Sequence, residues 1–92
     1  MEHVTPVHPG LVLKDELEEI GVSQAALAKH LGIPSKTINE ICRGKRGISA
    51  ARAVQLSRAL GASPQFWLNL QKNWELSRVK REHFGRIKRI AA

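Results

Sequence analysis

Glycine and serine alternate along this chain of 92 residues in a way that indicates where helices end and begin. Glycine tolerates the left-handed conformation that ends a helix, and a serine hydroxyl accepts a hydrogen bond from the free N–H groups that start the next one. Four such pairs occur: Gly21 with Ser23, Gly32 with Ser35, Gly47 with Ser49, and Gly61 with Ser63. They predict five helices, near residues 9–20, 24–31, 35–43, 50–60 and 64–77.

Apolar residues repeat at helical spacing inside these segments, as Leu13 and Leu17 do in the first, and no segment alternates as a strand would. We therefore expect an all-α fold with a single small domain of five helices. This domain covers residues 9–77, after an N-terminal arm formed by residues 1–8. A basic C-terminal extension, residues 78–92, follows it.

The second and third predicted helices are joined by only Gly32, Ile33 and Pro34. This connection is too short to lay the two helices antiparallel, and a turn of about three to four residues joins helices at roughly 90–120° in the helix-turn-helix unit. Ala28 is small, as expected where another helix crosses closely. On spacing alone two interpretations stay open, a DNA-binding helix-turn-helix and an ordinary helical corner without a ligand.

The distribution of charge favours DNA. The net charge is +7, and residues 23–58 carry seven basic side chains against Glu40 alone. Residues 78–92 hold six more basic side chains against one carboxylate. A basic middle and tail indicate a polyanionic partner, whereas the acidic first helix indicates a second partner that is itself basic.

The third helix is predicted to present polar side chains to solvent: Ser35, Lys36, Thr37, Asn39, Glu40 and Arg43. Lysine donates to guanine, asparagine pairs with adenine, and threonine hydrogen-bonds or touches a thymine methyl. Gln24 starts the preceding helix, where free N–H groups hold a phosphate. Lys45 and Arg46 follow, and Arg52 extends the set. Each cation alone is more commonly an ordinary surface charge, but as a contiguous set they favour DNA.

The run from His8 to Leu76 resembles the HigA-type antitoxins of bacterial toxin–antitoxin modules, which are small lambda-repressor-like, XRE-type helix-turn-helix proteins. HPG, INEI, GKRGIS and SPQFWLNLQ are the motifs that carry the resemblance. It implies a homodimer that binds double-stranded operator DNA in its own promoter, and a cognate toxin similar to RelE-type ribonucleases. The operator-contacting positions of the family fall on Gln24, Ser35, Lys36, Thr37 and Asn39, with DNA-backbone contacts from Arg43, Lys45 and Arg46.

The fifth helix carries more large apolar surface than so small a domain is expected to cover. Trp67, Leu70 and Trp74 are therefore predicted to form a two-fold dimer interface, with the alternative that the aromatic rings close the core of one chain. Such a dimer would place two recognition helices about 34–36 Å apart, one turn of DNA.

The first helix offers an acidic face made by Asp15, Glu18 and Glu19. Ribonucleases of the implied kind are basic, so this face is the predicted toxin contact. A plain solvated helix face is the alternative. The basic tail lies outside the resemblance, and three roles stay open for it: phosphate contacts, an extra helix on the dimer, or a mobile end.

No catalytic pattern is present, so we expect no enzyme, cofactor or small-molecule substrate. The four histidines are scattered without a carboxylate at metal-binding spacing, and GKRG lacks the rest of a phosphate-binding loop. Cys42 has no second cysteine to pair with and is expected to be a small buried apolar side chain.

The location and the role have their own expectations. No apolar run approaches the roughly 18–20 residues of a membrane span, and no signal peptide is recognisable, so a cytoplasmic protein is expected. Two alternatives to the antitoxin stay open. One is a stand-alone transcriptional repressor of the same fold, and the other is a toxin-blocking protein with little operator affinity.

Overall fold

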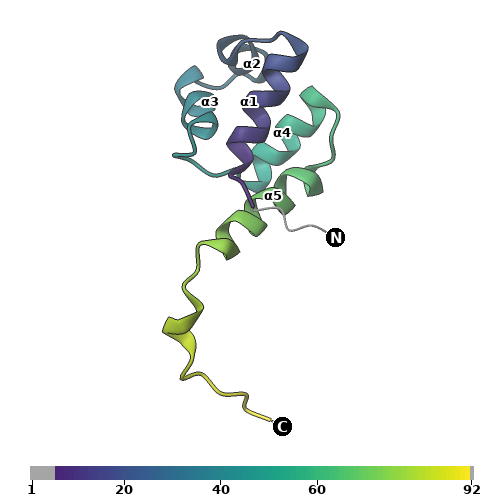
Figure 1. Cartoon of the computed structure of the whole chain (residues 1–92). Helices are drawn as coiled ribbons and strands as arrows, with labels where there is room; N and C mark the ends of the chain where they lie inside the picture. The colour runs from purple at the N-terminus through teal and green to yellow at the C-terminus, as the bar shows by residue number, and fades with distance from the viewer. Residues whose placement is uncertain (1–5, 92) are drawn as a thin grey trace.

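The computed structural model describes residues 6–91, which form five α-helices and one short 3-10 helix. The helices are α1 (Pro9–Ile20), α2 (Gln24–Leu31), α3 (Ser35–Cys42), α4 (Ala50–Leu60), α5 (Pro64–Ser77) and η1 (Arg81–Phe84). The predicted all-α, five-helix fold is confirmed (Figure 1). Only α3 differs from its expected range, because it ends one residue earlier. The first five residues of the predicted arm, and Ala92, lie outside the described part of the chain.

Three of the four predicted serine caps form. Ser23, Ser49 and Ser63 each accept a hydrogen bond from the backbone N–H three residues ahead, at 3.0, 3.2 and 3.1 Å. Ser35 instead opens α3 as its first residue, because Pro34 takes the capping position without a side-chain hydrogen bond. The α1, α2 and α4 helices end at glycines in the left-handed conformation: Gly21, Gly32 and Gly61.

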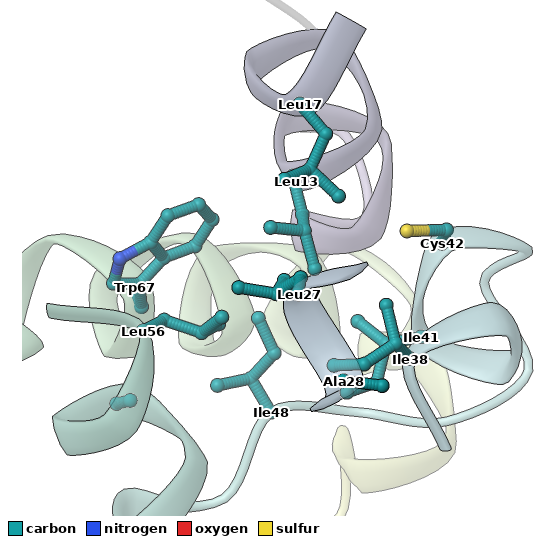
Figure 2. Packing of buried hydrophobic residues seen from close by; sticks show 11 residues of the cluster. Leu13, Leu17, Leu27, Ala28, Ile38, Ile41, Cys42, Ile48, Leu56 and Trp67 are labelled. Carbon is teal, nitrogen blue, oxygen red and sulfur yellow. The ribbon is translucent and has the colours of Figure 1, made fainter. Parts of the chain in front are cut away.

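One hydrophobic core holds the five helices together (Figure 2). Its largest fully buried side chains include Leu13 of α1, Ile38 and Ile41 of α3, Leu56 of α4 and Trp67 of α5. Burying an aliphatic side chain of this size contributes about 1.5–3 kcal/mol. The two isoleucines therefore fix one side of α3 against the core, and the opposite side of this helix is left to solvent.

The approach of α1 to α3 is close enough to require a glycine. A β-carbon added at Gly10 would overlap the backbone carbonyl oxygen of Ile41, which belongs to the helix itself and cannot swing away. Ala28 of α2 is also buried, at 1% exposure, as the close crossing predicted from the sequence requires. The orientation of α3 thus depends on two small residues, of which sequence reasoning found one.

His8 belongs to the folded domain rather than to the N-terminal arm in which the sequence analysis placed it. Its Nδ1 accepts a hydrogen bond of 2.9 Å from the backbone N–H of Gly10, which caps the start of α1. The ring meets Trp74 of α5 edge to face, with centroids 4.7 Å apart. Burial lowers the pKa of the imidazole, because the charged form loses water there.

The chain after α5 leads away from the helical body (Figure 1). All side chains of residues 78–91 are exposed, including the apolar Phe84 and Ile87 at 54% and 74%. The basic tail therefore adds charge and apolar surface outside the domain without contributing to its core.

Candidate nucleic-acid interface

Half of the eight predicted DNA-binding residues lie on or directly after the solvent side of α3. Ser35, Lys36 and Asn39 are exposed, and Arg43 follows immediately after the helix. Positions three and four apart share a helix face, so Lys36, Asn39 and Arg43 form one continuous strip. This strip lies opposite Ile38 and Ile41 and consists of hydrogen-bonding and cationic groups.

The predicted place of Thr37 on this strip is wrong. Its side chain is only 8% exposed. Thr37 lies next to Ile38 and one helical turn before Ile41, which puts it on the core side of α3. It is therefore removed from the set of DNA-contacting residues.

A side-chain hydrogen bond joins the start of α2 to the middle of α3. The Asn39 Nδ2 donates to Gln24 Oε1 at 3.2 Å. Both residues line a shallow hollow together with Ser35 and Lys36. The bond joins Gln24 to the exposed strip, and it leaves the Gln24 amide nitrogen as a donor for a phosphate and the Asn39 oxygen as an acceptor for a base.

The basic loop after α3, residues 43–48, is anchored by α5. The backbone N–H of Ile48 donates to Gln71 Oε1 at 2.8 Å, and Gln71 Nε2 donates to Glu75 at 3.0 Å. A β-carbon at Gly47 would come within 2.8 Å of the same amide, so this glycine lets the loop lie against it. Sequence reasoning missed Gln71, although its position one turn after Trp67 was the available signal.

One carboxylate sits on this otherwise cationic surface. Glu40 of α3 accepts two hydrogen bonds on Oε1, from Arg46 Nε at 3.0 Å and from Arg46 Nη2 at 2.7 Å. These bonds hold the pKa of Glu40 below its usual value, and the charges of Lys36 and Lys45 act in the same direction. The loop cation Arg46 is thereby tied to the side of α3, with its side chain still 52% exposed.

The three residues of the predicted dimer surface do not all reach the surface of the chain. Trp67 is 1% exposed and belongs to the core, so its assignment to a dimer interface is wrong. It packs edge to face against Phe66, which is 42% exposed. Leu70 and Trp74 are half-buried and remain candidates for contact with a second chain. Spacing alone could not separate these residues, because helix periodicity does not say which aromatic ring reaches the core.

The predicted acidic face of α1 is open to solvent. Asp15, Glu18 and Glu19 are exposed, and none of them forms an ion pair within residues 6–91. Ile20 follows at 49% exposure and lines an apolar hollow with Val22 of the next turn and with residues of α2 and α4. Carboxylates and apolar side chains are therefore neighbours at this end of the molecule.

Two absences hold for residues 6–91. No group of three or more histidine, cysteine or acidic side chains is gathered as metal ligands. No helix there has both the length and the apolar character needed to cross a bilayer.

A short helix, a three-residue turn and a second helix with one polar, cation-flanked face define a helix-turn-helix domain. The chain belongs to the helix-turn-helix family, because the family model HTH_3 (Helix-turn-helix) matches residues 13–67. The predicted resemblance to HigA-type antitoxins is confirmed by named relatives. The chain is 40% identical over 67 residues to antitoxin HigA-1 of Vibrio cholerae, covering 72% of this chain and 63% of that protein.

Solved structures extend the similarity to nearly the whole chain. An addiction module antidote protein of the HigA family from Coxiella burnetii is 34% identical, with a TM-score of 0.82, and the match covers 97% of this chain and 98% of the other. Antitoxin HigA of Pseudomonas aeruginosa, solved with the higBA promoter, is 41% identical with a TM-score of 0.83, covering 92% and 98%. Several curated relatives are longer, since the chain spans 65% of virulence-associated protein A′ of Dichelobacter nodosus.

Proposed function

We propose that this chain is an antitoxin that binds operator DNA in its own promoter, represses its operon and neutralises a cognate ribonuclease toxin. The observation that carries the DNA-binding part is the exposed strip of α3, held outward by Ile38 and Ile41 and flanked by basic residues. The Pseudomonas relative was solved with promoter DNA, which supports the same role. Such a repressor acts in the cytoplasm, where bacterial DNA lies.

The side chains divide by chemistry. Lys36 and Asn39 are assigned to base edges in the major groove, and Ser35 either to a base or to a phosphate. Gln24, at the start of α2, is assigned to a phosphate together with the free N–H groups of that helix end. The cations that follow α3 are assigned to the DNA backbone: Arg43, Lys45 and Arg46.

Binding to a labelled duplex from the region upstream of the chain's own reading frame tests this function. Lys36→Ala and Asn39→Ala should each weaken binding by about 1–3 kcal/mol and relax base preference. Lys72→Ala removes the same charge from an exposed site on α5 and serves as the matched control. Equal losses in all three variants, or no preference of the wild-type protein for this duplex over a scrambled one, would contradict the assignment.

We also propose a two-fold dimer, with Leu70 and Trp74 at the contact. Both side chains are half-buried in the single chain, and apolar surface continues beyond them along the exposed end of α5 and the tail. Sedimentation equilibrium at micromolar concentration should give the mass of two chains. Leu70→Asp should lower the apparent mass toward that of one chain. A single-chain mass for the wild-type protein would overturn the proposal.

For the toxin we propose the acidic face of α1. Asp15, Glu18 and Glu19 offer charge to a basic partner, and the neighbouring apolar hollow offers surface that a stable contact needs. Reversing all three charges should abolish neutralisation of a co-expressed toxin, while the variant should still bind the upstream duplex. Unchanged neutralisation would remove this surface from consideration.

A stand-alone repressor is the second candidate, because a helix-turn-helix domain needs no toxin to bind DNA. The two candidates differ in the transcript. A small basic open reading frame beside this one, whose product co-purifies with the chain, supports the antitoxin. A protein without such a neighbour, but with full operator affinity, supports the repressor.

A further inference from the structure

The contact between Glu40 and Arg46 is one-sided. Arg46 uses Nε and Nη2, and both of these nitrogens converge on the same carboxylate oxygen. A guanidinium is planar with five N–H donors, so the edge that carries Nη1 is not part of this contact. The arginine is therefore oriented by Glu40 and still has donors to offer.

Two features place this contact beside the candidate DNA surface. Glu40 comes directly after Asn39 and one turn after Lys36, so it flanks the exposed strip on the side of the basic loop. The loop itself is held at two points, by the N–H of Lys45 donating to the Glu40 carbonyl at 2.9 Å and by Ile48 bonded to Gln71. The arginine thus has a fixed backbone as well as a fixed head group.

Glu40 is also the single acidic residue between positions 23 and 74. A carboxylate among cations lowers attraction to phosphate in general, so for DNA affinity alone it is a cost. By holding Arg46, Glu40 also favours binding, because an arginine that is already held in one orientation loses less conformational freedom when it binds DNA.

We propose that Glu40 is a positioning residue for DNA recognition: it holds Arg46 so that the outer edge of the guanidinium meets one backbone phosphate when α3 lies in its proper register. This rests on the proposed function. Arginine matches phosphate in two parallel hydrogen bonds, which depend on angle. DNA in another register meets an arginine that cannot reorient and a carboxylate that repels phosphate, so the pair favours the operator over other DNA.

Glu40→Gln replaces the charged acceptor of Arg46 by a weaker neutral one, and its comparison with Glu16→Gln, which removes the same charge elsewhere, separates orientation from charge. Binding is measured with the upstream duplex and with a scrambled duplex of equal length, each over a series of salt concentrations. The Kd for the upstream duplex should rise about three- to tenfold, the loss expected when one side chain must be ordered on binding. The Kd for the scrambled duplex should fall, because Arg46 is released and can reach a phosphate in any register. For this duplex the slope of log Kobs against log salt should steepen by about 0.9, the value of one added phosphate contact.

Two further variants make the result decisive. Glu16→Gln changes the net charge by the same amount, but on α1. It should leave unchanged both the ratio of the two Kd values, upstream against scrambled, and the difference between the two salt slopes. Arg46→Lys keeps the charge but loses the planar guanidinium with its paired donors. It should therefore weaken binding to the upstream duplex as Glu40→Gln does, and the double variant should bind this duplex little more weakly than either single variant.

A parallel change of both Kd values in Glu40→Gln, or additive losses in the double variant, would overturn the positioning role. Thermal unfolding of each variant confirms that the fold is intact. A wild-type protein that does not prefer the upstream duplex at all would instead count against the proposed function, so the two failures are distinguishable.

Discussion

At the scale of single residues, the start of α1 has the most specific chemistry of the domain. His8 caps the helix through Nδ1 and meets Trp74 with its ring edge, and Gly10 lets the backbone of α1 touch that of α3. The sequence HPG therefore encodes a capping acceptor, a proline suited to a first helical turn, and a residue without a side chain. Each of the three has a different physical reason for its place.

Gly10→Ala should be strongly destabilising. The added methyl group would overlap the Ile41 carbonyl, and relief requires α1 and α3 to separate, which costs about 3 kcal/mol. Thermal unfolding should show a midpoint lower by about 10–20 °C. Gly85→Ala in the tail is the matched control, because the nearest atom there lies 3.7 Å from the added carbon. Equal midpoints for both variants would disprove the close approach.

His8 should make stability depend on pH. The folded state disfavours the protonated ring, so as pH falls below 6.5 the unfolded chain takes up the proton first and the free energy of unfolding decreases. Urea unfolding at pH 7.5 and 5.0 should show this loss, at most about 1.4 kcal/mol per pH unit. His8→Asn keeps a capping acceptor without titrating and should flatten the dependence in this window. A slope that persists in this variant belongs to another group.

At the scale of elements, the basic loop after α3 is as firmly placed as the helices beside it. Its buried anchor is the amide of Gln71, which accepts from Ile48 and is itself held by Glu75. The end of the loop is therefore held by α5, a helix distant in sequence, whereas its first residues are bonded to α3.

Gln71→Ala should release this loop. The Ile48 N–H would lose its acceptor while buried, at a cost of about 1–3 kcal/mol in the free energy of unfolding. Hydrogen exchange at Ile48 should accelerate, and DNA binding should weaken although no DNA-contacting group is removed. Gln65→Ala, an exposed glutamine on the same helix, is the control and should change neither. Unaltered exchange at Ile48 would show that the loop is held elsewhere.

The elements were predictable because their signals are local. A serine or glycine needs only its own few neighbours to start or end a helix, so four of the five predicted helix ranges agree with the structure. The identity of the buried face was less accessible. Thr37 and Trp67 were misplaced because periodicity gives relative positions on a helix but not the direction of the core. Gly10 and Gln71 act through partners far along the chain, as the His8 ring does on Trp74, and helix periodicity does not specify such partners.

At the scale of the whole molecule, the proposed partners have separate surfaces. The DNA strip is on α3, the acidic face is on α1, and the candidate dimer contact is toward the end of α5. The basic tail leaves from that same end of α5 (Figure 1). Because these surfaces do not share residues, each proposal can be tested by substitutions that leave the others unchanged.

Removal of residues 79–92 should weaken operator binding and flatten its dependence on salt. The deleted segment carries five basic side chains, and each phosphate that it contacts contributes about 0.9 to the slope. Residues 79–91 are exposed and give the core no side chain, so the thermal midpoint should be nearly unchanged. An unaltered salt slope would show that the tail does not contact DNA.

The meeting of Gly10 with the Ile41 carbonyl has a consequence for how such proteins diversify. Because the backbone of α1 rests on the backbone of α3 there, the angle of α3 to the rest of the domain does not depend on the side chains that α3 exposes to solvent. Substitutions at these outward residues therefore change the chemistry of the exposed face without changing how α3 is mounted on the domain. Under the proposed function, a few substitutions on this face are enough to change the preferred DNA sequence, and the packing of the domain stays the same.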